Sequence, residues 1–283
     1  MNGSSRSIAI KKNIIASLFL KGISILVSLQ VVPLTINYIN PTRYGIWLTL
    51  SSIVAWLSYF DLGFAHGFRN RFAEAVAKGD MQLAREYVST TYVVLSLLFS
   101  SVFLIAIVVN HFVDWSAILN VDAAYSSELN IVFGILAFFF CLNIVASIFT
   151  TMLTANQKPA LASLIQTLGQ VFGFICIYIL TKTVPGNLDV LAFAFSGVPC
   201  FLLIIISIGM FLSGRYRHLS PSFHFVHFSL TKKIVGLGGQ FFIIMISMLF
   251  VFQLINIVIS RVAGPMAVTQ YNIAYKYFNV LVM

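Results

Sequence analysis

Residues 88–110 read VSTTYVVLSLLFSSVFLIAIVVN, a run without a single charged side chain. One α-helix needs about 20 mostly apolar residues to cross the ~30 Å hydrocarbon core of a bilayer, so this run is long enough to span a membrane. It lacks the alternating pattern of a barrel strand, and a helix satisfies its backbone hydrogen bonds within one segment. The stretch therefore predicts a transmembrane helix.

Seven further apolar runs occur along the 283-residue chain, separated by short polar connections as in a polytopic membrane protein. We therefore expect an all-α polytopic membrane protein. Its architecture would be one six-helix transmembrane bundle plus the first two helices of a second bundle, the second of them incomplete. The further runs lie at about 14–38, 44–63, 128–153, 161–182, 188–212, 236–260 and 268–283.

The composition excludes several classes of protein. Only 9% of the residues are charged and 59% are hydrophobic, whereas about 25% of an ordinary soluble domain is charged. The formal net charge is +9, but the basic residues are spread over separate loops without a basic groove or aromatic platform, so nucleic acid is not an expected partner. The three cysteines lie inside apolar runs without paired spacing, which argues against disulfides and a zinc site.

The distribution of Lys and Arg predicts the orientation in the membrane. If the N-terminus is cytoplasmic, the cytoplasmic connections hold twelve of these residues and the external loops hold three. Positive residues are enriched in the cytoplasmic loops of membrane proteins. The sequence therefore predicts a multi-pass protein with a cytoplasmic N-terminus.

A weak internal repeat divides the chain. A lysine pair precedes both the first and the seventh run, and a turn containing proline follows both, as in transporters built from two related bundles. We predict an N-terminal six-helix bundle at 1–218, a cytoplasmic linker at 219–235 and the start of a second bundle at 236–283. The repeated features are Lys11 and Lys12 with Asn40 and Pro41, and Lys232 and Lys233 with Gly264 and Pro265.

A polar stripe crosses the first apolar run. An ionisable group at bilayer depth is costly unless it faces a partner or water, so Lys21 indicates a functional site. Ser17, Lys21, Ser24 and Ser28 follow one another at i, i+4, i+7 and i+11 and share one helix face. We expect this face to look into the bundle or a cavity, with Lys21, Ser24 and Ser28 binding substrate.

A second stripe occupies the matching position of the second half, where Asn272, Lys276 and Asn279 recur at helical spacing. Two lysines that face a common cavity would attract an anionic headgroup such as a diphosphate. Asn272 and Lys276 therefore complete the predicted substrate-binding set. The alternative is that each lysine snorkels to the membrane interface or pairs with a backbone carbonyl.

Asp61, near the end of the second run, is the candidate coupling site for a proton or cation, or a counter-ion for the lysines. The alternative is a local salt bridge or cap with the region of Arg69 and Arg71. On the run at 161–182, Gln170 is expected to join helices by hydrogen bonds, and the GxxxG at 169–173 to allow close helix packing.

No Gly-rich phosphate loop, nucleophile elbow or zinc signature is present in the sequence. We therefore predict no catalytic residues, no metal ligands and no cofactor, and we do not expect an enzyme. A membrane-embedded glycan polymerase or ligase would need a large external loop with catalytic groups. The longest external segment is short and offers only His111, Asp114, Asp122 and Glu128.

Several short motifs carry a family pattern. Together they resemble the bacterial polysaccharide flippases, which export lipid-linked intermediates of O-antigen (lipopolysaccharide) and capsule and belong to the multidrug/oligosaccharidyl-lipid/polysaccharide exporter superfamily. The motifs are Lys12-Asn13-Ile14, Lys21-Gly22, Pro33-Leu34-Thr35, Tyr44-Gly45-Ile46-Trp47, Asp61-Leu62-Gly63, Arg69-Asn70 and Ser89-Thr90-Thr91-Tyr92.

The resemblance implies two six-helix bundles in a V-shape and alternating access. It implies transfer of a polyprenyl-diphosphate-linked oligosaccharide across the bacterial inner membrane, with a cationic cavity for the diphosphate. The expected partners are this lipid-linked substrate, membrane lipids and the polysaccharide polymerase machinery. Since the family usually has twelve or more spans, the chain reads as a C-terminally truncated member.

Two alternatives keep the same fold. A cation-coupled multidrug extruder would be expected to have a carboxylate-rich cavity in its N-terminal half, whereas only Asp61 is available here. An inactive fragment would insert its helices without transporting anything.

Overall fold

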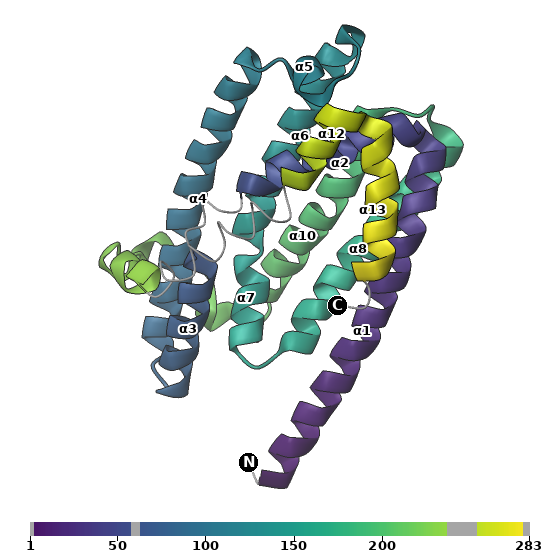
Figure 1. The fold of residues 1–283 in the computed structure, drawn as a ribbon. Coiled ribbons are helices and arrows are strands. Elements are labelled where there is room, and N and C mark those ends of the chain that lie inside the picture. The colour runs from purple at the N-terminus through teal and green to yellow at the C-terminus, as the bar shows by residue number, and fades with distance from the viewer. Residues whose placement is uncertain (1–2, 58–62, 237–253, 280–283) are drawn as a thin grey trace.

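The structure is a computed structural model that describes residues 3–57, 63–236 and 254–279. Within these ranges every regular element is a helix (Figure 1), which confirms the all-α prediction. Five of the helical segments are long and apolar enough to cross a membrane, so the chain is a multi-pass membrane protein. These segments are Asn13–Ile39, Met81–Phe112, Ala123–Ala155, Pro159–Thr183 and Leu188–Leu212.

The helices follow one another with short connections. Three of them, η2, η4 and η5, are single 3-10 turns, and η3 is one turn of π-helix. In chain order they are α1 (Gly3–Ile39), α2 (Pro41–Ala55), α3 (Phe64–Ala77), α4 (Met81–Phe112), α5 (Trp115–Leu119), η2 (Ala123–Tyr125), α6 (Ser126–Ala146), α7 (Ile148–Ala155), α8 (Pro159–Thr183), α9 (Leu188–Ala192), η3 (Phe193–Gly197), α10 (Val198–Leu212), η4 (Arg217–Leu219), η5 (Phe223–Phe225), α12 (Leu254–Ala263) and α13 (Pro265–Asn279).

Three of the predicted runs are seen in part. The second run corresponds to α2, which begins before it. The Asn40 side chain accepts a hydrogen bond from the Arg43 amide at 3.0 Å and caps the helix. Pro41 then occupies a first-turn position, where its missing N–H is not needed. The last two runs correspond to α12 and α13, and residues 58–62, 237–253 and 280–283 of the three runs lie outside the described residues.

The long helices α1, α4, α6, α8 and α10 form a bundle (Figure 1). One end holds the start of α1, α3 and the connection 213–236, and we call it the basic end because Arg, Lys and His side chains concentrate there. The opposite end holds α5 and the short helices α2 and α12 (Figure 1). The division into domains at 218 and 235 stays a prediction.

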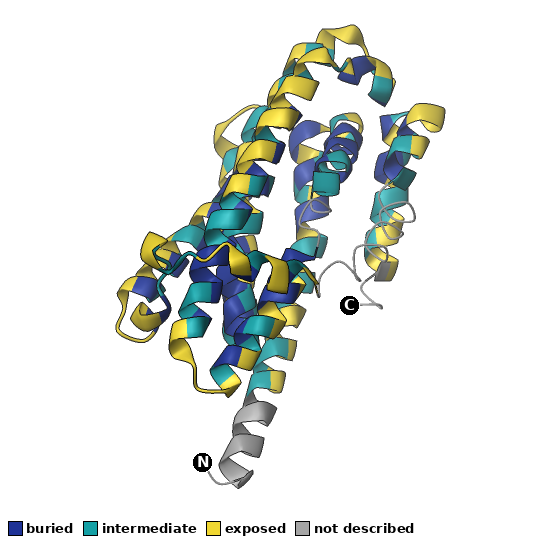
Figure 2. Ribbon diagram, turned by 90° about the vertical axis from the view of Figure 1, so that its left-hand side faces the viewer, coloured by how far each residue is buried: buried dark blue, intermediate teal, exposed yellow. Residues whose placement is uncertain are grey.

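Two apolar clusters fill the bundle. One cluster, near the basic end, includes Phe68 of α3, Phe99 of α4 and Phe149 of α7, and all three are fully buried. Toward the opposite end, Trp47 of α2 and Leu119 of α5 are buried in a second cluster. The outward side of α4 is exposed instead (Figure 2), as expected of a surface that contacts lipid.

The helices α12 and α13 pack against α2 at the opposite end. A Cβ atom added at Gly45 would lie 1.8 Å from the carbonyl oxygen of Pro265, so only glycine permits this approach. The Thr269 hydroxyl donates to the carbonyl of Pro41 at 2.6 Å. The Ser260 hydroxyl donates to the carbonyl of Leu119 at 2.9 Å and ties α12 to α5.

Candidate substrate pocket

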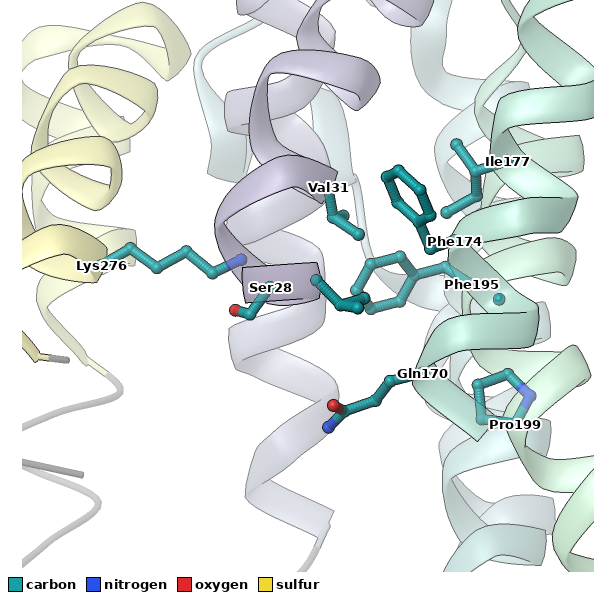
Figure 3. Close-up of a pocket in the computed structure, with 10 residues that line it drawn as sticks. Ser28, Val31, Gln170, Phe174, Ile177, Phe195, Pro199 and Lys276 are labelled. Atoms are coloured by element: carbon teal, nitrogen blue, oxygen red, sulfur yellow. The ribbon is translucent and has the colours of Figure 1, made fainter. Parts of the chain in front are cut away.

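A pocket of about 180 Å³ lies between α1, α8, the start of α10 and α13 (Figure 3). Its walls are mainly apolar, and three polar side chains reach it from three different helices. Lys276 extends from α13 toward Ser28 on α1 (Figure 3). The lining residues are Val27, Ser28, Val31, Gln170, Gly173, Phe174, Ile177, Phe195, Pro199 and Lys276.

The wall formed by α8 and α10 depends on small residues. Gly169 and Gly173 face Pro199, and Cβ atoms added there would lie 3.2 Å and 3.6 Å from that ring. This close contact confirms the packing role expected of the GxxxG segment. The π-turn η3 precedes Pro199, and such turns re-aim side chains within a helix. Phe195 in this turn lines the pocket. Its ring packs edge-to-face on that of Trp47, with the two ring centroids 5.2 Å apart.

Lys276 supplies the charge of the pocket. Of the lining residues in the described part of the chain, it alone is charged, and its side chain is half-buried. A charge with apolar neighbours interacts more strongly with an opposite charge than it would in water, because the local dielectric constant is lower. The ammonium group has three hydrogen-bond donors, and the Ser28 hydroxyl adds a fourth donor. The arrangement is chemically suited to a small anionic group.

The remaining predicted substrate-binding residues of α1 lie beside this pocket. The Ser24 hydroxyl donates to the Gln170 side chain and joins α1 to α8, which is the helix-joining role expected of Gln170. Lys21 is exposed and does not line the pocket. Ser17 is half-buried, and its hydroxyl has no hydrogen-bond partner among the described residues.

The predicted site residues outside α1 differ in whether they reach the pocket. Asn272 is one turn from Lys276, but it belongs to a hydrogen-bonded network of α12 and α13. Asp61 and the side chain of Asn279 lie outside the described residues. The structure thus brings Ser28 and Lys276 together, while substrate binding by Lys21, Ser24, Ser28, Asn272 and Lys276 stays a prediction.

The network joins α2, α12 and α13 through the side-chain amides of the buried Asn256 and the partly buried Asn272. The Asn256 amide donates to the Ser52 hydroxyl at 2.6 Å, and the Asn272 amide donates to the Asn256 side-chain oxygen at 2.7 Å. Sequence reasoning missed this network, because Ser52 and Asn256 lie in different runs. The available signal in the sequence was Asn256 itself, because an asparagine inside an apolar run requires a hydrogen-bond partner.

The charged groups at the two bundle ends are held in local contacts. At the basic end, Glu74 accepts hydrogen bonds from Lys78 at 2.8 Å and Arg71 at 3.0 Å, and these bonds lower the pKa of its carboxyl group. At the opposite end, Arg43 lies 3.5 Å from the Glu128 carboxylate. These pairs are exposed or partly exposed, so they contribute little to stability individually.

Comparisons with known proteins identify the family and a similar fold. The family described as "Polysaccharide biosynthesis protein" matches residues 10–283. A search of curated proteins found no match. Among solved structures, the chain is similar to an inward-facing conformation of a multidrug resistance MATE family transporter of the MOP superfamily, with a TM-score of 0.64 and 13% identity.

That similarity covers 94% of this chain and 58% of the other, so the chain spans little more than half the length of that transporter. At this identity the similarity concerns the fold alone. The family match, by contrast, extends over nearly the whole chain. The chain is therefore a member of the polysaccharide biosynthesis protein family, with a fold similar to that of the solved transporter.

Proposed function

We propose that this protein takes part in flipping a polyprenyl-diphosphate-linked oligosaccharide across the bacterial inner membrane, for the synthesis of surface polysaccharide such as O-antigen or capsule. The family match and the transporter fold support this proposal. The observation that carries it is the half-buried Lys276, which extends into an apolar pocket between the N-terminal helices and α13. A cation in such a place suits a diphosphate group.

The pocket is too small for the whole substrate. A volume of about 180 Å³ fits a charged headgroup, while the sugar and the polyprenyl chain would extend from it. Ser24 and Lys21 precede Ser28 by one and two turns of α1 toward the basic end. We infer that the diphosphate follows this helix face, meeting Lys21 near the basic end and Lys276 deeper in the bundle.

The orientation of this path follows from charge. We infer that the basic end is cytoplasmic, with the N-terminus on that side, because positive residues favour the cytoplasmic face. The contacts of α2 with α12 and α13 would then close the external side. Alternating access requires these contacts to separate during transport, so that the pocket faces each side in turn.

A multidrug extruder is the second candidate, because the solved transporter that the chain is similar to belongs to that class. The lining of the pocket argues against a cationic drug. It contains Lys276 and, within the described residues, no carboxylate. Electrostatic repulsion would disfavour a cation beside this ammonium group.

Complementation tests the proposal. The complete reading frame is expressed in a strain that lacks its own flippase and makes the matching lipid-linked glycan, and surface polysaccharide is measured. We expect the wild type to restore it, Lys276→Ala to fail, and Lys182→Ala, a change at an exposed lysine, to behave as wild type. Failure of the wild type would contradict the proposed substrate. Full activity of Lys276→Ala would contradict the proposal that the pocket of Lys276 binds the diphosphate.

A further inference from the structure

The outward side of α4 carries a groove that the proposed transport path does not use. A pocket of about 430 Å³ lies between the first half of α4 and residues 221–223. A second pocket, of about 140 Å³, lies further along the helix between α4 and α6. Ser96 lines both pockets, so they follow one another along the same helix.

The lining residues of α4 form a single stripe. Ser89, Val93, Ser96, Ser100 and Phe103 line one or both pockets and lie at i, i+4, i+7, i+11 and i+14. This spacing keeps side chains on one helix face. The stripe covers 14 steps of about 1.5 Å, or roughly 21 Å. It therefore exceeds one leaflet of a ~30 Å hydrocarbon core.

This groove opens on the lipid-facing surface of the bundle. On the same helix Leu97, Leu104 and Ile105 are 59%, 64% and 63% exposed, and Figure 2 shows the exposed residues along this side. Water is scarce at this depth of a bilayer, so an apolar groove that opens here is filled by hydrocarbon chains.

Positive charge lies at the end of the groove nearest the basic end. The Arg85 guanidinium donates to the carbonyl of Ser220 at 2.9 Å and lies over the ring of Phe225, 4.2 Å from its centroid. It is therefore held next to Pro221 and Ser222, which line the groove.

The connection 213–236 adds to this charge. It is fastened to α4, since the Ser222 amide donates to the Ser89 hydroxyl at 3.1 Å. The chain contains no Asp or Glu after Asp189, so the connection is purely basic. The carboxylate of Glu86 on α4 lies close to this connection, with its oxygen 3.8 Å from the His227 ring nitrogen Nε2. The Arg, Lys and His residues of the connection are Arg215, Arg217, His218, His224, His227, Lys232 and Lys233.

Aromatic side chains complete the rim of the groove. Phe223 is 87% exposed and Phe228 is 62% exposed, although both belong to the basic connection. Exposed aromatic residues beside basic ones are typical of segments that lie in the membrane interface, where the ring enters the acyl boundary and the charge meets anionic headgroups.

We propose that this groove binds one anionic phospholipid, with an acyl chain along α4 from Ser89 to Phe103 and the headgroup beside Arg85 and the connection 213–236. The charge at the mouth selects an anionic headgroup, and the stripe of roughly 21 Å is long enough to hold an acyl chain that crosses one leaflet. The groove lies across the bundle from α1 and α13, which border the pocket of Lys276 (Figure 1), so it is a lipid site separate from the transport path.

Native mass spectrometry tests the site. The full chain is released from vesicles of phosphatidylglycerol and phosphatidylcholine in equal amounts, and the lipid that stays bound is identified. We expect one phosphatidylglycerol per chain in the wild type. Ser96→Phe fills the groove and should lower this retention at least tenfold, while Ser101→Phe, an equal change at an exposed serine of the same helix, should not.

Phe223→Ser provides an independent variant, because it changes an 87% exposed side chain and leaves the core intact. It should also lower retention of phosphatidylglycerol, with helicity by circular dichroism equal to that of the wild type. Equal retention of the two lipids by the wild type would overturn the proposal. Undiminished retention in both Ser96→Phe and Phe223→Ser would also overturn it.

Discussion

The Asn256 amide donates a hydrogen bond to the Ser52 hydroxyl at 2.6 Å, across 204 positions of sequence. Asn256 also accepts a hydrogen bond from Asn272, so one buried amide joins α2, α12 and α13. Thr269 and Gly45 contribute further contacts in the same place. These residues fasten α12 and α13 to the N-terminal helices at the end opposite the basic one.

Asn256→Ala should weaken this junction. The substitution removes the hydrogen bonds of Asn256 to Ser52 and Asn272, and a typical hydrogen bond contributes about 0.5–1.5 kcal/mol to stability. We expect a lower melting temperature in detergent. A double-mutant cycle with Ser52→Ala should give a coupling of about 0.5 kcal/mol or more. Asn37→Ala, at an exposed position of α1, is the control. Additive effects of Ser52→Ala and Asn256→Ala would contradict the contact.

Gly45→Ala should separate α2 from α13. The added Cβ would meet the Pro265 carbonyl oxygen at 1.8 Å, and since both groups are backbone the helices have to move apart. We expect reduced thermal stability and reduced complementation. Gly209→Ala is the matched control, because nothing lies within 4 Å of its added Cβ. That change should keep activity and stabilise α10 by up to about 1 kcal/mol. Equal behaviour of the two variants would contradict the close approach.

The Asp114 cap of α5 should make stability depend on pH. Its carboxylate accepts hydrogen bonds from Ser116 and Ala117, and these bonds lower the pKa of Asp114. A carboxyl group with a lowered pKa stabilises the fold above its ordinary pKa of about 3.9, and this contribution is lost as the pH falls through the folded-state pKa. We expect Asp114→Ala to remove this dependence and Asp114→Asn to keep the cap.

Thermal melts between neutral and acidic pH measure this effect. Near neutral pH, Asp114→Asn should melt between Asp114→Ala and the wild type, because its side chain offers an oxygen to the amides of α5 but carries no charge. Asp114→Ala should melt lower at neutral pH and approach the wild type in acid. A constant difference between wild type and Asp114→Ala at every pH would contradict a charged cap.

Hydropathy predicted the membrane-spanning helices well, because one uncharged run such as 88–110 already satisfies the length requirement of the bilayer. Hydropathy could not predict which side chains contact one another across helices. The pairing of Ser52 with Asn256 depends on how distant helices pack, and the hydropathy of the run at 188–212 does not mark the π-turn at 193–197. Helical spacing placed Ser28 on a polar face, whereas its position near Lys276 follows from the packing of α13 against α2.

The substrate prediction centres on Lys276, and flipping of a fluorescent lipid-linked oligosaccharide in proteoliposomes tests it most directly. The complete protein is reconstituted as wild type, Lys276→Ala, Lys276→Arg and Lys182→Ala, and the initial rate of transfer is measured. We predict a rate at least tenfold lower for Lys276→Ala, equivalent to about 1.4 kcal/mol or more. We predict a smaller loss for Lys276→Arg, which keeps the charge, and no loss for Lys182→Ala. An undiminished rate with Lys276→Ala would contradict the account.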